Sequence, residues 1–216
     1  MLSPEAKVGR YGRIAGMNQG DWGDNRKSKA GYEYLLAYKR SLRRYKRLKV
    51  TVPIYDYTIE FCKRWIDYKS RTKDQMEQAA RSGMQNISEG NKQQSLAGYI
   101  KLAGVARGSL EELLKDYLAF ARQNKLEVWE KERGIREIGE IGEIWGIIKG
   151  NPTLPNNPNF PDLPLDKEKA VNLLITLINQ ANYLLDKLIS SLKEKHMKEG
   201  GLNEKLYKAR KEFRGY

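Results

Sequence analysis

The chain has 216 residues, with 40 Lys and Arg against 27 Asp and Glu, a formal net charge of +13. A single Cys excludes an intramolecular disulfide, no apolar run is long enough to cross a bilayer, and the N-terminus lacks a secretory apolar stretch, so a reducing, cytoplasmic setting without membrane is expected. One His and one Cys cannot supply a metal-ligand cluster, and no phosphate-binding or dinucleotide loop is present, so we expect no metal and no cofactor.

The positive charge is concentrated at the two ends of the chain. Residues 1–49 hold 13 basic and 4 acidic side chains, residues 193–216 hold 8 and 4, and residues 50–192 hold 19 of each. A neutral middle with cationic ends is typical of a protein that binds a polyanion. Charge runs are also typical of solvated surface or disordered tails, so that alternative stays open. The sequence predicts a basic arm (1–49), a helical body (50–192) and a basic tail (193–216).

Residues 1–30 are rich in Gly and polar groups and are expected to form a flexible arm, whereas residues 32–49 combine basic and aromatic side chains. On a helix, four of the arginines would fall at i, i+3, i+4 and i+7, along one stripe. Arg has a planar fork that suits phosphate, and Tyr can stack on unpaired bases. The alternatives are a solvated helix face and a membrane-surface helix. The segment has few large apolar residues, which weakens the second alternative. The candidate nucleic-acid-binding residues are Tyr38, Lys39, Arg40, Arg43, Arg44, Tyr45, Lys46, Arg47 and Lys49.

Two helices are expected next. Pro53 marks the start of the first, because Pro is tolerated in a first turn. Its apolar face is predicted to contain Ile54, Thr58, Phe61, Trp65 and Tyr68. Thr72 and Gln75 form a capping-box pattern for the second helix, whose periodicity stops around Glu89 and Gly90. Its buried face would consist mostly of small residues that allow close approach of a neighbour: Met76, Ala79, Ala80, Gly83 and Ile87.

Ser95 is expected to begin the third helix, which has the clearest pattern in the chain. Its apolar residues recur at intervals of three and four, as in a helical bundle: Tyr99, Leu102, Ala106, Leu110, Leu113, Tyr117 and Phe120. Glu111, Glu112 and Asp116 lie at other positions and are expected to face solvent or another subunit. They lack the His partner of a di-iron site, and no nucleophile is near a base, so we expect no catalytic residues.

Residues 127–149 have Ile at three-residue intervals with Gly between, which indicates a helix that depends on tertiary contacts. Residues 151–165 hold five prolines and are expected to form an extended linker. Asp166 should cap the last long helix, and Gly200–Gly201 should end it. Its predicted apolar stripe is Val171, Leu174, Ile178, Ala181, Leu185, Leu188 and Leu192. The fold class is therefore all-α, an antiparallel up-down four-helix bundle.

Three segments of the second helix, 71–76 (RTKDQM), 78–82 (QAARS) and 85–90 (QNISEG), are followed by 108–112 (GSLEE) in the third. In this order they resemble the bacterial four-helix bundle family known from proteins encoded in 23S rRNA intervening sequences. Residues 54–120 look closer still to the subgroup called four helix bundle suffix domain proteins. The resemblance covers about the middle half of the chain.

The resemblance implies a left-handed antiparallel bundle that assembles in relatives into a ring-like homopentamer with a basic surface. One relative is the accessory protein of diversity-generating retroelements, which partners a reverse transcriptase and binds nucleic acid. The family signature maps onto Arg81, Asn86, Glu89, Gly90, Ser109 and Glu112.

A structural role is expected for these signature residues. Gly90 would let the backbone turn out of the second helix, and Asn86 and Glu89 would bond the backbone groups freed there or the start of the third helix. Arg81 would pair with Glu89 or Glu112 across the bundle.

The sequence thus favours a non-catalytic nucleic-acid-binding accessory protein, a homo-oligomer that binds RNA in preference to DNA through phosphate and shape, with rRNA or a reverse transcriptase as its partner. The alternative is a protein-interaction scaffold whose basic ends dock an acidic partner without nucleic acid.

Overall fold

The structure is a computed structural model that describes residues 49–140 and 162–215. The chain divides into two units, Met1–Arg40 and Ser41–Tyr216, and all described residues belong to the second. Every regular element in these ranges is a helix, which confirms the all-α prediction. The helices are α3 (Thr51–Trp65), α4 (Arg71–Asn91), α5 (Leu96–Gln123), α6 (Lys131–Glu140), α8 (Lys167–Glu199) and α9 (Leu202–Arg214).

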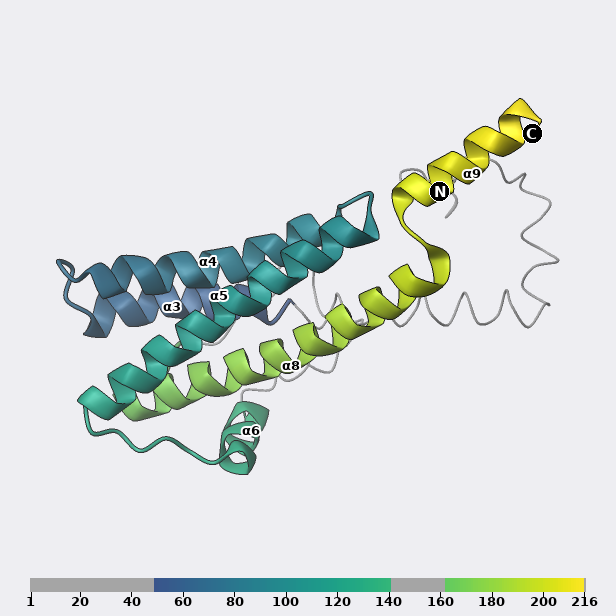
Figure 1. The fold of residues 1–216 in the computed structure, drawn as a ribbon. Helices are drawn as coiled ribbons and strands as arrows, with labels where there is room; N and C mark the ends of the chain where they lie inside the picture. Colours follow the sequence, from purple (N-terminus) through teal and green to yellow (C-terminus); the bar gives the residue numbers. More distant parts are fainter. Residues whose placement is uncertain (1–48, 141–161, 216) are drawn as a thin grey trace, which may run out of the picture. The chain divides into compact units, whose positions relative to one another are not determined.

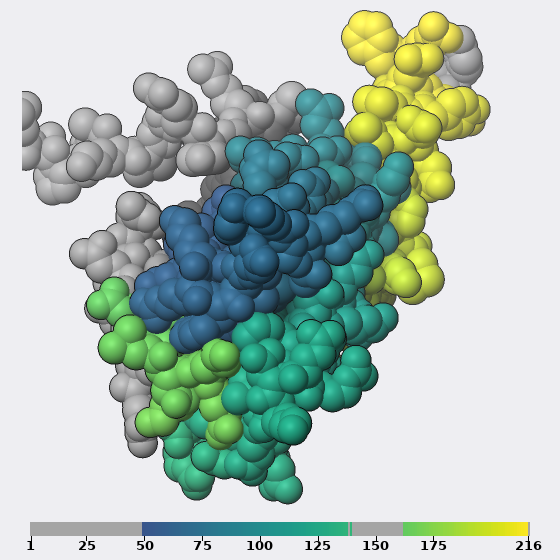
Figure 2. Space-filling view, turned by 90° about the vertical axis from the view of Figure 1, so that its left-hand side faces the viewer, coloured from purple at the N-terminus to yellow at the C-terminus, as the bar shows by residue number. Residues whose placement is uncertain are grey.

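Four of these helices form an antiparallel bundle (Figure 1). Helix α3 packs along α4 and α8, and α5 packs along the same two helices from the other side. Two polar contacts show that α5 and α8 are antiparallel. Lys167 Nζ, at the start of α8, lies 3.4 Å from Asn124 Oδ1 at the end of α5, whereas Asp186 Oδ1, further along α8, lies 3.1 Å from Arg107 Nε, earlier in α5. In Figure 2 the blue surface of α3 and α4 lies directly against the teal surface of α5. The predicted up-down bundle is confirmed.

The core is centred on aromatic rings of α3 and α5. The centroid of the Phe61 ring lies 4.9–5.0 Å from the ring centroids of Trp65, Tyr117 and Phe120. The pairs with Tyr117 and Phe120 have the edge-to-face geometry that aromatic rings prefer. The Tyr117 hydroxyl is fully buried and donates to Thr58 Oγ1 at 3.0 Å. Because this hydrogen bond satisfies the hydroxyl, Tyr117 can lie among apolar side chains at little cost.

Side-chain caps mark the starts of α4, α5 and α8. Ser95 Oγ accepts from the Gly98 N–H at 3.0 Å, and Asp166 Oδ1 accepts from the Lys169 N–H at 2.8 Å, so both predicted caps are confirmed. The predicted capping box at Thr72 is wrong. Ser70 caps α4 instead, because its Oγ accepts from the Thr72 N–H at 3.2 Å and Thr72 is already helical.

The end of α3 also differs from the prediction. The helix begins at Thr51, which places Pro53 in the first turn as expected, but it ends at Trp65. Asp67 accepts a hydrogen bond from the Lys69 N–H at 2.9 Å, a local turn that competes with helix continuation. Tyr68 therefore lies in this turn, 78% exposed, rather than on the apolar face.

Glycine allows α4 and α5 to approach closely. A Cβ on Gly83 would lie 2.7 Å from Leu110 Cδ2, and one on Gly90 would lie 2.8 Å from Tyr99 Cδ2. The expectation that Gly90 lets the chain leave the helix is wrong, because α4 continues to Asn91. Gly90 instead provides the space that the Tyr99 ring occupies.

The segment after α5 is bound to α8 by one buried amide. Asn172 Oδ1 accepts from the Trp129 N–H at 2.8 Å, and Asn172 Nδ2 donates to the carbonyl oxygens of Glu127 (2.8 Å) and Glu168 (2.9 Å). Helix α6 follows and packs against α8. It accounts for part of the helix expected over 127–149, of which residues beyond 140 lie outside the described ranges.

Most of the predicted proline linker, residues 151–161, also lies outside the described ranges. The return to the bundle is held by Arg64 of α3, whose Nη1 donates to the carbonyl oxygens of Leu163 (3.0 Å) and Pro164 (3.2 Å). Leu163 is buried in the core. Glu60 forms an ion pair with the same guanidinium, so Arg64 is fixed from both sides.

Candidate nucleic-acid interface

The predicted arginine stripe lies outside the described residues. This applies to Tyr38, Lys39, Arg40, Arg43, Arg44, Tyr45, Lys46 and Arg47. Lys49 is described: it is half-buried in the turn before α3, and its carbonyl oxygen accepts from the Val52 N–H at 3.0 Å. The nucleic-acid-binding role of this arm stays a prediction.

Two of the signature residues belong to a polar network between α4 and α5. Asn86 Nδ2 donates to the carbonyl oxygen and to Oγ of Ser82, at 2.9 and 3.1 Å. Ser82 Oγ lies 2.8 Å from Ser109 Oγ on α5. Asn86 thus orients the side chain that bridges the two helices, and the expectation that it bonds backbone groups freed at the helix end is wrong.

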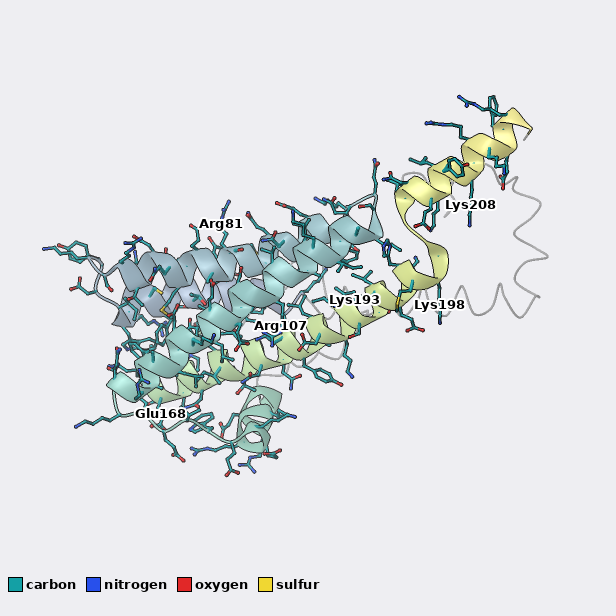
Figure 3. All side chains as sticks on the ribbon, viewed as in Figure 1. Arg81, Arg107, Glu168, Lys193, Lys198 and Lys208 are labelled. Carbon is teal, nitrogen blue, oxygen red and sulfur yellow. The ribbon has the colours of Figure 1, made fainter. Side chains whose placement is uncertain are left out.

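The charged signature residues Arg81, Glu89 and Glu112 face solvent. The expected ion pair of Arg81 with Glu89 or Glu112 is not formed between these described residues, and Figure 3 shows Arg81 pointing away from the bundle. The guanidinium of Arg81 is therefore available to a ligand on the outer face of α4.

The other carboxylates of α5 have roles within the chain. Arg107 forms a 2.7 Å ion pair with Glu111 and a 3.1 Å ion pair with Asp186, which joins α5 to α8 (Figure 3). Burial, and then the neighbouring Glu112 carboxylate, raises the pKa of Asp116 above its ordinary value. Within residues 49–140 and 162–215 no three His, Cys or acidic side chains are arranged to hold a metal ion.

The cationic C-terminal end contains both neutralised and free side chains. Carboxylates of α8 pair with three lysines of this end, at 3.8 Å for Lys195, 2.6 Å for Lys198 and 2.9 Å for Lys205. A second group of basic side chains forms no ion pair with any described residue. We call this group the free cations: Lys193, Lys208, Arg210 and Lys211. Lys193 and Lys208 are labelled on α8 and α9 in Figure 3. These free cations can meet phosphates without first breaking an internal pair.

Helix α9 was missed by the sequence reasoning, which treated residues after Gly201 only as a basic tail. The structure has 13 helical residues there, with Tyr207 exposed beside the basic side chains. The signal that could have found the helix is the spacing of Leu202, Leu206, Ala209 and Phe213 at intervals of four, three and four. Basic and aromatic side chains on one helix form a surface suited to phosphate contact and base stacking.

The fold and the site define a class: a small antiparallel helical bundle with a cationic C-terminal helix. No helix in the described part of the chain is long and apolar enough to cross a bilayer.

Comparison with protein families places the chain more closely. The family described as 23S rRNA-intervening sequence protein matches residues 43–146, from the predicted arginine stripe through α3, α4, α5 and α6. Residues 43–146 are thus similar to this family, as the signature segments indicated. Helices α8 and α9 lie beyond the match. No curated protein and no solved structure matched the chain.

Proposed function

We propose that this protein is a non-catalytic, cytoplasmic accessory protein that binds RNA in preference to DNA. The bundle serves as a neutral scaffold, and the cationic ends contact the sugar–phosphate backbone. The family's link to 23S rRNA supports RNA as the ligand class. A five-subunit ring and a reverse transcriptase partner are further expectations from the family resemblance.

The distribution of charge is the observation that carries this proposal. The body, residues 50–192, has equal numbers of basic and acidic side chains, whereas the N-terminal 49 residues carry a net +9 and the last 24 carry +4. Solubility alone does not require this separation, because interspersed charges would serve it as well. Binding of a polyanion favours clustered positive charge, because each phosphate contact releases a condensed counterion.

The bundle itself supports a scaffold role. Two of its half-buried arginines are already paired: Arg64 with Glu60, and Arg107 with Glu111 and Asp186. These side chains hold helices and linker together, so they are not available for phosphate. At the two ends of the chain, the free cations and the predicted arginine stripe remain for binding RNA.

Recognition would depend on phosphate and shape rather than base sequence. Lys and Arg contacts to the backbone position a protein without reading bases, and exposed Tyr side chains can stack on any unpaired base. Tyr207 of α9 and the predicted Tyr38 and Tyr45 of the arm offer such rings. A homo-oligomer would present several copies of these ends, which raises the effective affinity of each.

Fluorescence anisotropy with a labelled single-stranded RNA tests the proposal. In one variant Arg40, Arg43, Arg44 and Arg47 are replaced by Ala. The matched control replaces four exposed basic residues of the body, Lys63, Lys101, Lys115 and Arg122, so that both variants lose the same charge. We expect the arm variant to bind at least about tenfold more weakly than the control, because each phosphate contact contributes on the order of a factor of two or more.

Equal loss in the two variants would show that net charge alone attracts RNA and would contradict a specific role for the arm. Far-UV circular dichroism of both variants checks that the bundle is intact. The scaffold alternative makes a different prediction in a pull-down from nuclease-treated lysate: a scaffold keeps its acidic protein partner, whereas an RNA-linked assembly loses it.

A further inference from the structure

Helix α9 has an apolar stripe that nothing in the described part of the chain covers. Leu202, Leu206 and Phe213 are 37%, 54% and 93% exposed, and Ala209 is exposed as well. None of the 13 residues of α9 is buried. An isolated helix of this length is marginal in water, since most helical stability in proteins comes from packing of an apolar face. The helix therefore needs a partner to be fully formed.

The width of the stripe indicates what kind of partner it fits. At about 100° per residue, the four apolar positions fall within a sector of about 60°. A helix on a globular core or on a membrane surface has a broader apolar sector, of about 100° or more. A narrow stripe with intervals of four, three and four is typical of a coiled-coil seam, in which Leu206 and Phe213 occupy a positions and Leu202 and Ala209 occupy d positions.

Side-chain size then selects the direction of pairing between two copies of this seam. In a parallel pair, each a or d residue meets its own copy, so Ala209 would face Ala209 and Phe213 would face Phe213. That would leave a void in one layer and crowd the next. In an antiparallel pair, a meets d, so Leu206 faces Ala209 and Phe213 faces Leu202. Each layer then combines a larger with a smaller side chain, and the volume varies less along the seam than in the parallel pair.

The charges beside the seam select the same direction. Lys205 and Glu212 occupy g positions, and Arg210 occupies an e position. A parallel pair brings g of one copy near e of the other, which places Lys205 beside Arg210. An antiparallel pair brings g near g, which places Lys205 of each copy beside Glu212 of the other, with attraction on both ends of the pair. Lys205 also contacts Glu199 at 2.9 Å, and its three donors can serve both carboxylates.

We infer that α9 is a self-association element that pairs antiparallel with α9 of a second copy of this chain. The two seams cover each other, while Lys208 and Lys211 lie on the opposite side of the helix and stay free for a polyanion. This inference goes beyond the proposed function and does not depend on RNA binding, because the pair forms through apolar layers and two ion pairs within protein alone.

Disulfide trapping in the full-length protein tests the pairing and its direction. Two variants are prepared, Leu206→Cys and Ala209→Cys, one of them with a tag that changes its mass, and they are oxidised mildly alone and mixed without RNA. We expect a mixed disulfide in several-fold greater yield than either variant forms alone, because antiparallel layers join 206 to 209. The native Cys62 is not expected to form a disulfide in this assay, because burial raises the pKa of its thiol to about 12 and leaves little thiolate.

The matched control is Lys208→Cys, which places a thiol on the opposite side of the same helix. Equal trapping of this control would show random encounter of two mobile ends and would overturn the inference. A dominant disulfide in Leu206→Cys alone would mean parallel pairing and would also overturn it. RNA binding is measured separately, so failure here leaves the proposed function standing.

A charge exchange provides a second, independent readout. In the mixed cysteine assay, Glu212→Lys should lower the yield several-fold, because it places two positive groups side by side. Adding Lys205→Glu in the same chains restores opposite charges across the pair and should recover most of the yield. Failure of the double exchange to recover would contradict the antiparallel register, provided that circular dichroism shows the bundle unchanged.

Discussion

The bundle and α9 use the same apolar periodicity with opposite outcomes. In the bundle, facing stripes cover one another, and the half-buried cations Arg64 and Arg107 are neutralised by nearby carboxylates. In α9 the stripe is equally regular, yet no residue is buried and several cations have no partner in the described chain. A heptad-like pattern therefore predicts a helix, but only a facing stripe within the chain makes that helix part of the core.

The largest expected effect comes from making the same substitution in both regions. Leu174→Ala, at a fully buried position of α8, should lower the free energy of unfolding by about 2–5 kcal/mol, because it leaves a cavity in the core. Leu206→Ala in α9 should change it by less than about 0.5 kcal/mol at high dilution, where copies do not pair. Urea unfolding followed by far-UV circular dichroism measures both. Similar losses for the two variants would mean that α9 is part of the core.

A second contrast lies within α8, between two buried asparagines. The amide of Asn172 forms three hydrogen bonds, whereas neither amide atom of Asn182 has a partner in the described chain. Asn172→Leu should cost about 1–3 kcal/mol, because it leaves backbone groups of the segment after α5 unsatisfied. Asn182→Leu should instead stabilise by about 1 kcal/mol, since it removes unpaired polar atoms from the interior. Thermal unfolding of the two variants gives the sign, and the same sign for both would refute this contrast.

Glycine provides a third, smaller contrast. Gly83→Ala should destabilise by about 1 kcal/mol or more, because the new methyl group would meet Leu110 and this strain exceeds the gain in helix propensity. Gly108→Ala on α5 has open space and should stabilise by up to about 1 kcal/mol. Chemical denaturation midpoints test both. Stabilisation by Gly83→Ala would show that α4 and α5 can separate without loss.

The features that local chemistry determines could be predicted from sequence. Ser95 and Asp166 were identified as caps because a cap needs only its own oxygen and an N–H three residues on. Thr72 was chosen wrongly because Ser70 lies two residues earlier and has equivalent chemistry. Sequence cannot decide between two such candidates when the conformation of the preceding turn is unknown.

Features that depend on a neighbouring helix could not be predicted. Gly90 matters because the Tyr99 ring of α5 occupies the space beside it. Asn86 matters because it bonds Ser82, whose hydroxyl in turn contacts Ser109 of α5. Arg81 was expected to pair with Glu89 or Glu112 across the bundle, but it projects to solvent instead (Figure 3). The C-terminal part of the candidate site was anticipated only as an excess of charge, and its helical form was missed.

The last expected effect concerns alkaline pH and the buried thiol of Cys62. Burial raises its pKa from 9.0 to about 12, so the native state holds this proton more tightly than the unfolded state. The contribution of this thiol to the free energy of unfolding is fully present below about pH 9 and is lost as the pH rises toward about 12. Cys62→Ala should therefore have a shallower fall in unfolding free energy above about pH 9. An identical pH profile for both proteins would contradict a buried thiol.

The central claim, that a neutral bundle carries cationic ends which bind RNA, is tested most directly by the salt dependence of binding. The affinity of the full-length protein for a single-stranded RNA is measured over a range of salt concentrations. We expect log K to fall linearly with log salt. The slope should become shallower by about 0.7 for each phosphate that the arm variant no longer neutralises, and it should stay unchanged in the matched body variant. An affinity that does not change with salt, or no binding to RNA even in dilute buffer, would contradict the account.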